Sequence, residues 1–559
     1  MLRRAAIIVG LTAAFAPTAA AQGTQLLPGV TYDRTVSFTP HGVVVLHVIT
    51  APRPVGLYAL TPVLARGTLT GGLQPVTQIE RDVSPTATTV GINGDFVRSD
   101  GRPSGVWVSG GLLGQPPLAS RSSVGIDTAG TLHVDRVKLF GTWQGTGQRR
   151  TLTGLNAPPG PGQTVLFTSI YGPRAPVVAG AAEAVLGAFP PTAPNTDLAG
   201  SVTAVSAGGG ESIPPGGAVL MAAGGAAAKL QAEARIGTTV HARLGLQPAW
   251  DGVTAALGGG PVLVRNGKAV FRSLEDFTND QVGSRTARGA VGQLADGRIV
   301  LVAVDGGRPG YSAGLTSFEL AQTLVRLGAV TAAGVDPGDD VTAAFDGRLL
   351  NRPSGRVERA VKEALLVQYF GVYAPEPLLP LLTGEPGLAA EPISYKLVRP
   401  STVTAVLVGP DGAPHPLESG VAHAPGTYSF TANTFDHEGT WRWDVSATDD
   451  LGRTSTIERT FRFDTTLQAL AVPRTARKTV RVGFTLTRPA QVTLRIEATG
   501  GLLLRALPAA SLQPGAGAIR WDGKLPGGSL AFAGTYVAHL LVASDVGTSE
   551  RSVSFRFQR

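Results

Sequence analysis

Residues Ile299–Ser354 read IVLVAVDGGRPGYSAGLTSFELAQTLVRLGAVTAAGVDPGDDVTAAFDGRLLNRPS. The apolar, β-branched run Ile299–Val304 predicts a buried strand. An aspartate and a glycine-rich loop follow, and the segment from Ser317 then predicts a helix that ends at Gly328. A second short strand, Ala329–Val335, leads into another aspartate. We therefore expect a strand–loop–helix–strand unit in which each strand end delivers an aspartate and glycines.

This unit is the best place in the chain to expect a binding site, because ligands of such sheets bind at the carboxyl ends of strands. Its loops Asp305–Tyr311 and Asp336–Asp340 have two counterparts beside other predicted strands, Asn93–Phe96 and Gly258–Pro261. Aspartates can act as general acid or base or bind a hard cation, and arginines such as Arg285 can hold a phosphate with a bidentate fork. Each Asn-Gly or Asp-Gly pair is also an ordinary turn signal. The residues alone thus predict a polar, aspartate-rich site without specifying a reaction.

Composition limits the classes of protein that remain. A chain of 559 residues with 43% apolar residues should form two to four domains with real cores, and 73 glycines with 41 prolines favour many strands and turns. Cysteine is absent, which excludes thiol catalysis, cysteine metal ligands and disulfides. The net charge of +8 is spread without a basic block, so we expect no nucleic-acid partner. The histidines, His47 among them, lack metal-ligand spacing and are interpreted as structural.

The N-terminus has the pattern of a secretory signal peptide, residues 1–21. Arg3 and Arg4 precede the apolar run Ala5–Phe15, and small residues at Ala19–Ala21 form a cleavage site. No longer apolar run follows, so we expect no membrane span after cleavage. The predicted location is secreted, either extracellular or in the cell envelope.

Four segments are expected after the signal: a large first domain over 22–374, a proline-rich linker over 375–392, and two β-rich modules over 393–465 and 466–559. The modules show alternating apolar and polar residues in short runs, a pattern typical of β-sandwiches. Trp441, Trp443 and Trp521 lie on these runs and are interpreted as core residues.

The first domain resembles the phosphodiester glycosidase family over about residues 30–370. This family contains N-acetylglucosamine-1-phosphodiester α-N-acetylglucosaminidase and exopolysaccharide-associated bacterial proteins. The similar segments occur in the order of the family: Ile92–Phe96 with Gly101, Pro103 and Gly105; Leu155-Asn156 with Thr168 and Tyr171-Gly172; Gly258–Leu263 with Gly267; Arg285–Ala287 with Gly289; Val304–Gly314; and Gly347 with Asn351–Ser354. The resemblance implies an α+β domain with a mixed β-sheet, followed by the two Ig-like β-sandwich modules.

The resemblance also implies a hydrolase acting on sugar-1-phosphodiester linkages in envelope or exopolysaccharide glycans, without an organic cofactor. Asp305 and Asp336 would be acid/base or metal-holding carboxylates, Arg285 would hold the phosphate, and Asn93 would orient the sugar or a catalytic group. The implied substrate-binding residues are Gly94, Asp95, Gly259, Gly260, Arg308, Tyr311, Ser312 and Asn351.

One segment departs from the family pattern. Where the family has N-L-D-G-G-G-S followed by S or T, this chain has Gly334-Val335-Asp336-Pro337-Gly338-Asp339-Asp340. Proline lacks an amide hydrogen, and the two added carboxylates would repel a phosphate. Three interpretations stay open: the substrate differs; a divalent cation (Ca²⁺ or Mg²⁺) held by Asp336, Asp339 and Asp340 bridges to phosphate; or catalysis is lost and the protein is a glycan-binding or structural protein of the envelope.

The last module resembles the Ig-like module of flagellar hook-capping proteins. The similar residues are Arg520–Gly523, Gly527-Gly528 and Gly534–Tyr536. Such modules act as spacers or adhesive appendages in secreted bacterial proteins, so cell-wall association is an expected property.

Overall fold

The computed structural model describes residues 23–558 except 272, 356, 377–392, 431–436, 499–502 and 526. The predicted signal peptide and all but the first two residues of the predicted linker lie outside these residues. The described chain forms two compact units, one of residues 23–54, 61–79 and 91–365 and one of residues 55–60, 80–90 and 366–558. The fold is mostly β, with 54% of residues in strands and 8% in helices, so the helical share is small for an α+β domain.

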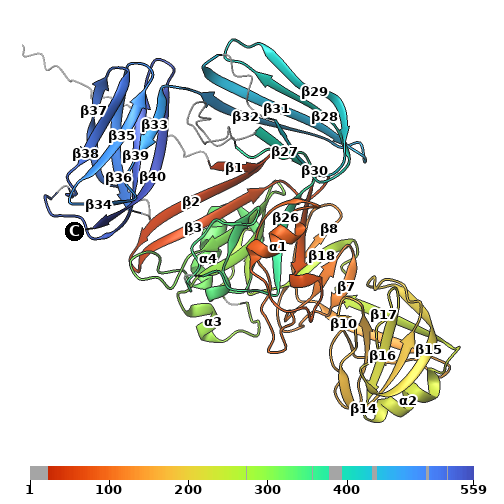
Figure 1. Ribbon diagram of the computed structural model, residues 1–559. Helices are drawn as coiled ribbons and strands as arrows, with labels where there is room; N and C mark the ends of the chain where they lie inside the picture. The colour runs from red at the N-terminus through yellow and green to blue at the C-terminus, as the bar shows by residue number, and fades with distance from the viewer. Residues whose placement is uncertain are drawn as a thin grey trace, which may run out of the picture. The chain divides into compact units, whose positions relative to one another are not determined.

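An eight-stranded sheet carries the unit Ile299–Ser354 (Figure 1). All its neighbouring strands pair antiparallel, so it is not the mixed sheet that the family resemblance implied. Its strands, in spatial order, are β1 (Thr24–Leu27), β2 (Val30–Thr39), β3 (Gly42–Ala51), β22 (Ile299–Val304), β21 (Arg288–Leu294), β23 (Ala329–Gly334), β19 (Val262–Arg265) and β20 (Lys268–Ala269). The predicted unit is confirmed within one residue for both strands. Strands β22 and β23 both run antiparallel to β21, so they are parallel to each other and end at the same edge.

Helix α4 (Ser317–Arg326) connects these two strands and packs on the sheet. Thr316 caps it: its hydroxyl accepts from the N–H of Glu319, and the Glu319 side chain accepts from the N–H of Thr316. Leu320 and Leu324 are buried against Val302 and other sheet residues. The short helix α3 (Asn279–Gly283) contacts α4. The turn at Asn266-Gly267 joins β19 and β20, as the sequence predicted.

Two five-stranded sheets hold other segments of the site. One has the order β25 (Arg348–Leu349), β24 (Ala343–Phe345), β5 (Thr88–Asn93), β26 (Glu363–Tyr369) and β4 (Tyr58–Leu64). The other has the order β7 (Leu112–Gln115), β6 (Trp107–Ser109), β18 (Val253–Gly258), β8 (Ser123–Asp127) and β9 (Leu132–Asp135). Helix α1 (Val76–Val83) and two 3-10 turns, η1 (Ala65–Gly67) and η2 (Gly338–Asp340), complete this part.

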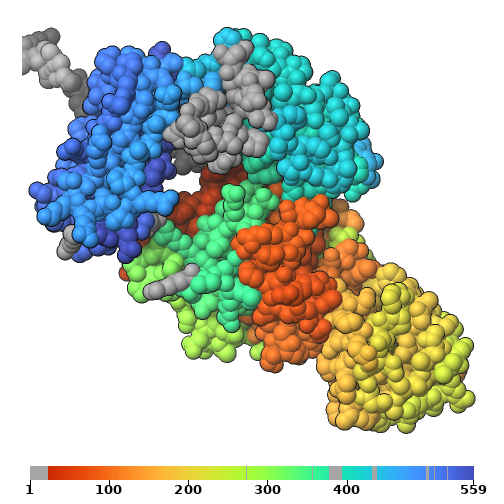
Figure 2. Space-filling model, viewed as in Figure 1, coloured from red at the N-terminus to blue at the C-terminus, as the bar shows by residue number. Residues whose placement is uncertain are grey.

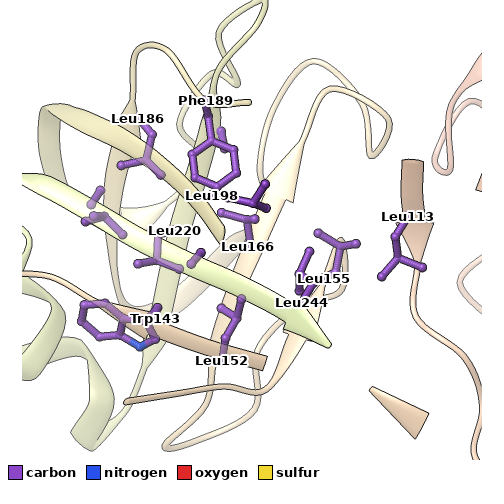
Figure 3. Packing of buried hydrophobic residues seen from close by; sticks show 14 of the residues in the cluster. Leu113, Trp143, Leu152, Leu155, Leu166, Leu186, Phe189, Leu198, Leu220 and Leu244 are labelled. Carbon is purple, nitrogen blue, oxygen red and sulfur yellow. The ribbon is translucent and has the colours of Figure 1, made fainter. Parts of the chain in front are cut away.

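Residues 138–247 form a lobe of their own within the first unit (Figures 1 and 2). Its sheet has the order β11 (Arg150–Leu152), β10 (Lys138–Gln144), β17 (Thr239–Gln247), β15 (Asp197–Gly209), β14 (Val177–Leu186), β16 (Ala218–Ala223), β13 (Thr164–Thr168) and β12 (Gly154–Leu155). Helix α2 (Gly225–Glu233) is the helix of this lobe. Figure 3 shows the apolar core of the lobe, in which Trp143, Leu166, Leu220 and Leu244 are almost fully buried.

The second unit contains two pairs of sheets that match the predicted β-rich modules. In 393–463 the sheets are β27 (Ile393–Leu397) with β30 (Gly426–Phe430), and β29 (Pro414–His423), β28 (Ser401–Val408), β31 (Gly439–Asp449) and β32 (Thr454–Phe463). In 467–558 they are β33 (Leu467–Ala471), β35 (Val480–Leu486) and β38 (Gly515–Trp521), and β34 (Thr475–Arg477), β40 (Thr548–Gln558), β39 (Gly534–Ala543), β36 (Ala490–Ala498) and β37 (Leu503–Leu512).

Tryptophans connect the two sheets within each module. The Trp443 ring on β31 lies 5.6 Å from the Phe430 ring on β30, and the Trp521 ring on β38 lies 5.2 Å from the Phe557 ring on β40. Trp441, Trp443 and Trp521 are at most 1% exposed, which confirms them as core residues. An Ig-like and hook-capping-like relationship of these modules stays a prediction.

Candidate functional site

Asp305 directly follows strand β22, and Asp336 lies two residues after the end of β23, which runs parallel to β22. One strand, β21, lies between them, so the two strand ends are about 10 Å apart at the same edge of the sheet. The loops after the strands are joined through the segment after Arg285: the N–H of Gly338 donates to the carbonyl of Ala287 at 2.9 Å. The structure therefore brings together the two aspartate loops that the sequence predicted.

Asp305 is the centre of a buried hydrogen-bond network. Its Oδ2 accepts from the hydroxyl of Tyr311 at 2.8 Å and lies 3.0 Å from Nε2 of His47, while its Oδ1 accepts from Nδ2 of Asn351 at 3.0 Å. The N–H of Arg352 donates to the same carboxylate. Burial opposes ionisation, but the bonds with His47, Tyr311 and Asn351 outweigh it and lower the pKa of Asp305. The oxygens of this carboxylate are thus occupied by the protein, and Asp305 is 1% exposed.

Tyr32 extends this network on the far side of His47. Its hydroxyl lies 2.8 Å from Nδ1 of His47 and donates to the carbonyl of Leu350 at 3.2 Å. Burial is the main reason that the pKa of Tyr32 rises to about 12. Ser312, a predicted substrate-binding residue, is also buried; its hydroxyl donates to the carbonyl of Asp305 and accepts from the N–H of Val45. These side chains fix the loop after β22 to the neighbouring strands.

Two arginine side chains lie over the ring of Tyr311. The guanidinium carbons of Arg308 and Arg352 lie 5.8 and 5.0 Å from the ring centroid. Arg308 was a predicted substrate-binding residue, and Arg352 is exposed. This side of the Asp305 loop therefore carries positive charge.

A second cluster consists of carboxyl groups: Asp95, Asp336, Asp340 and Glu363. Burial, a side-chain hydrogen bond with Asp340 and the charges of Asp340 and Asp95 raise the pKa of Asp336 well above its usual value. Burial also raises the pKa of Asp95 to about 6, although N–H groups of Gly105 and Phe96 favour its ionised form. Burial and the charge of Asp95 raise the pKa of Glu363. Four acids that affect one another in this way cannot all be ionised at neutral pH.

Asp336 is the member of the cluster that solvent reaches best. It is partly exposed, whereas Asp95 and Asp340 are 4% and 9% exposed and Glu363 is fully buried. Nε of the exposed Arg359 lies 3.1 Å from Oδ1 of Asp340. Asp336 is therefore an accessible carboxyl group whose raised pKa favours its protonated form.

Backbone contacts and glycines hold the acidic cluster in place. Oδ2 of Asp95 accepts from the N–H of Gly105 at 2.5 Å, and an added Cβ on Gly258 would lie 2.3 Å from that oxygen. Gly94 donates its N–H to the carbonyl of Glu363, where a Cβ would also collide. The glycines of these loops are thus needed for close approach of the backbone to carboxyl groups.

Asn93 lies between the loops and is 1% exposed. Its Nδ2 donates to the carbonyl of Asp336 at 2.8 Å, and its Oδ1 accepts from the N–H of Thr342 at 3.2 Å. Gly259 and Gly260 serve a similar purpose, since their N–H groups donate to the carbonyls of Ser122 and Gly334. These three predicted residues hold the Asp336 loop in position.

Arg285 is paired with Glu319 of α4, the same residue that caps the helix. The arginine uses Nη2 for this ion pair, while its Nη1 is buried and has no hydrogen-bond partner among the described residues. Nη1 is therefore a cationic donor available for a ligand oxygen.

The described residues do not fit the predicted divalent-cation site. No group of three or more His, Asp or Glu side chains in the described part of the chain is arranged to hold a metal ion. Asp339 is exposed, and Asp340 is paired with Arg359.

Sequence reasoning missed several members of both clusters. Glu363 lies beside a run of apolar residues that predicts a strand, so its sequence context does not indicate a site. His47 and Tyr32 are more than 250 residues from Asp305 along the chain. Arg359 and Glu319 carried no motif. Only the Asn-Arg-Pro-Ser segment, with Asn351, signalled the loop that completes the Asp305 network.

Comparison with known proteins shows that part of this chain is similar to one protein family. Residues 195–368 match the family model of phosphodiester glycosidase, a region that includes Arg285, Asp305, Asp336 and Asp340 but not Asn93 or Asp95. A curated relative, the SPbeta prophage-derived uncharacterized protein YomE of Bacillus subtilis, is 31% identical over 107 residues, which cover 19% of this chain and 16% of that protein.

Two solved structures resemble parts of this chain. A hypothetical protein from Synechocystis is 25% identical with a TM-score of 0.52, over 61% of this chain and 62% of that one. The catalytic domain of zebrafish N-acetylglucosamine-1-phosphodiester α-N-acetylglucosaminidase is 15% identical with a TM-score of 0.34, over 63% and 86%. Among the described residues no helix is long and apolar enough to cross a membrane. The segment that carries Arg285, Asp305 and the Asp336 loop is thus similar to phosphodiester glycosidases.

Proposed function

We propose that this protein hydrolyses sugar-1-phosphodiesters, with Asp336 as its general acid. The observation that carries the proposal is the pair of interacting carboxyl groups of Asp336 and Asp340, one accessible and one held by Arg359, at a strand end inside the region similar to phosphodiester glycosidases. A catalytic acid must keep its proton near neutral pH, and a raised pKa provides that.

In the proposed reaction water attacks the anomeric carbon and the bond from that carbon to the phosphate oxygen breaks. Neutral Asp336 donates its proton to the departing phosphate oxygen, and the water, which attacks the opposite face of the sugar ring, releases its proton to solvent. The products are a free sugar and a phosphate monoester. Asp336, which is partly exposed, then takes up a proton from solvent, and the charge of Asp340 keeps its pKa raised.

Arg285 would bind the phosphate through Nη1, the donor left without a partner beside Glu319. This agrees with the role that the family resemblance implies for Arg285. Asp305 and Asn93 take a different role in this proposal from the catalytic one expected from sequence: both are buried and position the loops that carry the reacting groups.

Export and an envelope or exopolysaccharide substrate belong to the proposal as well. They are supported by the signal-like residues 1–21 and by the two β-rich modules that follow the first domain, which would serve as attachment or spacer elements.

The test is release of free sugar from a panel of glycosyl-1-phosphodiesters by the purified full chain, with EDTA and with added Ca²⁺ or Mg²⁺. We expect release from at least one substrate, at an equal rate with and without cations. Absence of release from every substrate under all conditions would overturn the proposal.

A non-catalytic glycan-binding function is the second candidate. It is favoured by Pro337, which removes an amide donor from the loop, and by the ion pair that engages Arg285 in the absence of substrate. Glycan binding that persists in Asp336→Asn, together with no turnover by the parent protein, would select this function.

A further inference from the structure

A cleft of about 810 Å³ lies on the α4 side of the candidate site. Its lining includes Val262 and Leu263 of β19, Phe271 and Leu274 of the loop after β20, Val282 of α3 and Phe318 of α4. This volume is in the range of small-molecule binding sites, roughly 300–1,000 Å³.

The walls of the cleft are predominantly apolar. Phe271 and Phe318 pack edge to face with 5.1 Å between ring centroids, yet Phe271 remains 72% exposed. Leu274 is 84% exposed and adopts φ = 56°, a left-handed conformation that is strained for leucine. An aliphatic and an aromatic side chain are thus presented to solvent at one cleft.

The two carboxylates of the lining are already used by the protein. Oε1 and Oε2 of Glu275 accept from the N–H groups of Val262 and Ser122 at 2.7 and 2.6 Å. Glu319 is engaged by Arg285 and by Thr316. The cleft therefore offers a ligand apolar contact and little charge.

A cavity of only about 10 Å³ lies between the cleft and the acidic cluster. This cavity shares Pro261, Leu263, Phe277 and Ser317 with the cleft, and it also touches Phe96 and Pro337, which follow Asp95 and Asp336 in the chain. Arg285, with its unpaired Nη1, contacts the cleft wall at Glu319. A ligand whose phosphate is held at Arg285 thus has an apolar surface beside it.

We propose that the cleft binds an alkyl chain on the phosphate, so that the preferred substrates are sugar phosphodiesters whose second alcohol is a lipid-like alkyl alcohol. This inference rests on the proposed function, because that function places the phosphate of the substrate at Arg285. Each methylene that becomes buried in the cleft raises affinity about fourfold.

The test measures binding by titration calorimetry of the full chain with a sugar-free pair, hexyl phosphate and methyl phosphate. We expect hexyl phosphate to bind at least 30-fold more tightly, and the ratio to fall at least fivefold in Phe271→Ala. Phe140→Ala, which removes an exposed phenylalanine from the lobe, is the matched control and leaves the ratio unchanged. Equal affinity for the two phosphates, or an unchanged ratio in Phe271→Ala, would overturn the inference.

Measurement of hydrolysis rates distinguishes a failure of this inference from a failure of the proposed function. Hydrolysis of methyl and hexyl sugar phosphodiesters with equal kcat/KM would overturn the alkyl preference while the hydrolase function stands. A retained hexyl-to-methyl ratio in binding without any hydrolysis would support the cleft and count against the hydrolase.

Discussion

Nε2 of His47 lies 3.0 Å from Oδ2 of Asp305, and the two side chains are 1% and 0% exposed. This contact links β3 to the residue after β22, and the two strands pair over Leu46–Ala51 and Ile299–Val304. Tyr311, Asn351 and the backbone of Arg352 supply the remaining donors to the same carboxylate. A carboxylate surrounded in this way holds several chain segments together, so the role of Asp305 is structural.

Replacing Asp305 by alanine should destabilise the first unit by about 3 kcal/mol, because His47 and Asn351 would lose buried hydrogen bonds. The measurement is the midpoint of urea unfolding followed by fluorescence. Asp296→Ala, which breaks the exposed pair with Arg298, is the control and should leave the midpoint unchanged. A midpoint equal to that of the wild type in Asp305→Ala would contradict the positioning role.

Asp340→Asn should move the basic limb of the pH–rate profile to lower pH. The charge of Asp340 is one cause of the raised pKa of Asp336, so removing it allows Asp336 to lose its proton earlier. The profile of kcat on the best substrate of the panel measures the shift. Asp339→Asn, a substitution of the exposed neighbour, should leave the profile in place; equal profiles in all three proteins would exclude the pair as the acid.

The stability of the first unit should fall as pH rises from about 4 to about 6. The pKa of Asp95 rises from 3.8 to about 6 on folding, so the folded state binds more protons in this window. The loss is at most about 1.4 kcal/mol per pH unit for each such carboxyl group. Asp95→Asn removes one of these groups, and its stability should depend less steeply on pH than that of the wild type. The midpoints of urea unfolding at pH 4.5, 5.5 and 6.5 measure this dependence for both proteins. An identical dependence of the midpoint on pH in the two proteins would contradict the burial of an ionisable Asp95.

Gly258→Ala should impair both folding and activity. Its Cβ would lie 2.3 Å from Oδ2 of Asp95 and 2.7 Å from Cα of Gly105, so the acidic cluster must move. We expect about 1–3 kcal/mol of destabilisation. Gly225→Ala in α2, where a Cβ meets nothing within 4 Å, is the control and should be neutral or slightly stabilising. Equal unfolding midpoints in the two variants would show that the cluster tolerates the extra carbon.

The elements around the site could be predicted from local patterns. Ile299–Val304 is an unbroken apolar run, and the amphipathic period of α4 ends at Gly328, which adopts φ = 91°. The alternating runs of the C-terminal part likewise predicted strands, which the described residues of 393–558 form. The α+β class was implied by the family resemblance and not by the residue patterns, and the fold has 54% of residues in strands and 8% in helices.

The chemistry of the site could be predicted only in part. Motif positions indicated Asp305 and Asp336 as site residues. They did not indicate which of the two carboxyl groups is buried and fully hydrogen-bonded within the protein. That difference depends on His47, Tyr32 and Asn351, which come from distant parts of the chain. Glu363 and Arg359 set the charge of the acidic cluster, and neither carries a local signal. The departure at Pro337–Asp340, which suggested a cation site from sequence, instead places Asp340 beside Asp336 and Arg359.

The most direct test of the account is the rate of free-sugar release by the wild type and by Asp336→Asn, with matched circular dichroism spectra. The account predicts release by the wild type and a loss of about 10²–10⁴-fold in the variant, the range expected for removal of a general acid. Equal rates in the two proteins would contradict the assignment of Asp336, and no release by either would contradict the hydrolase function itself.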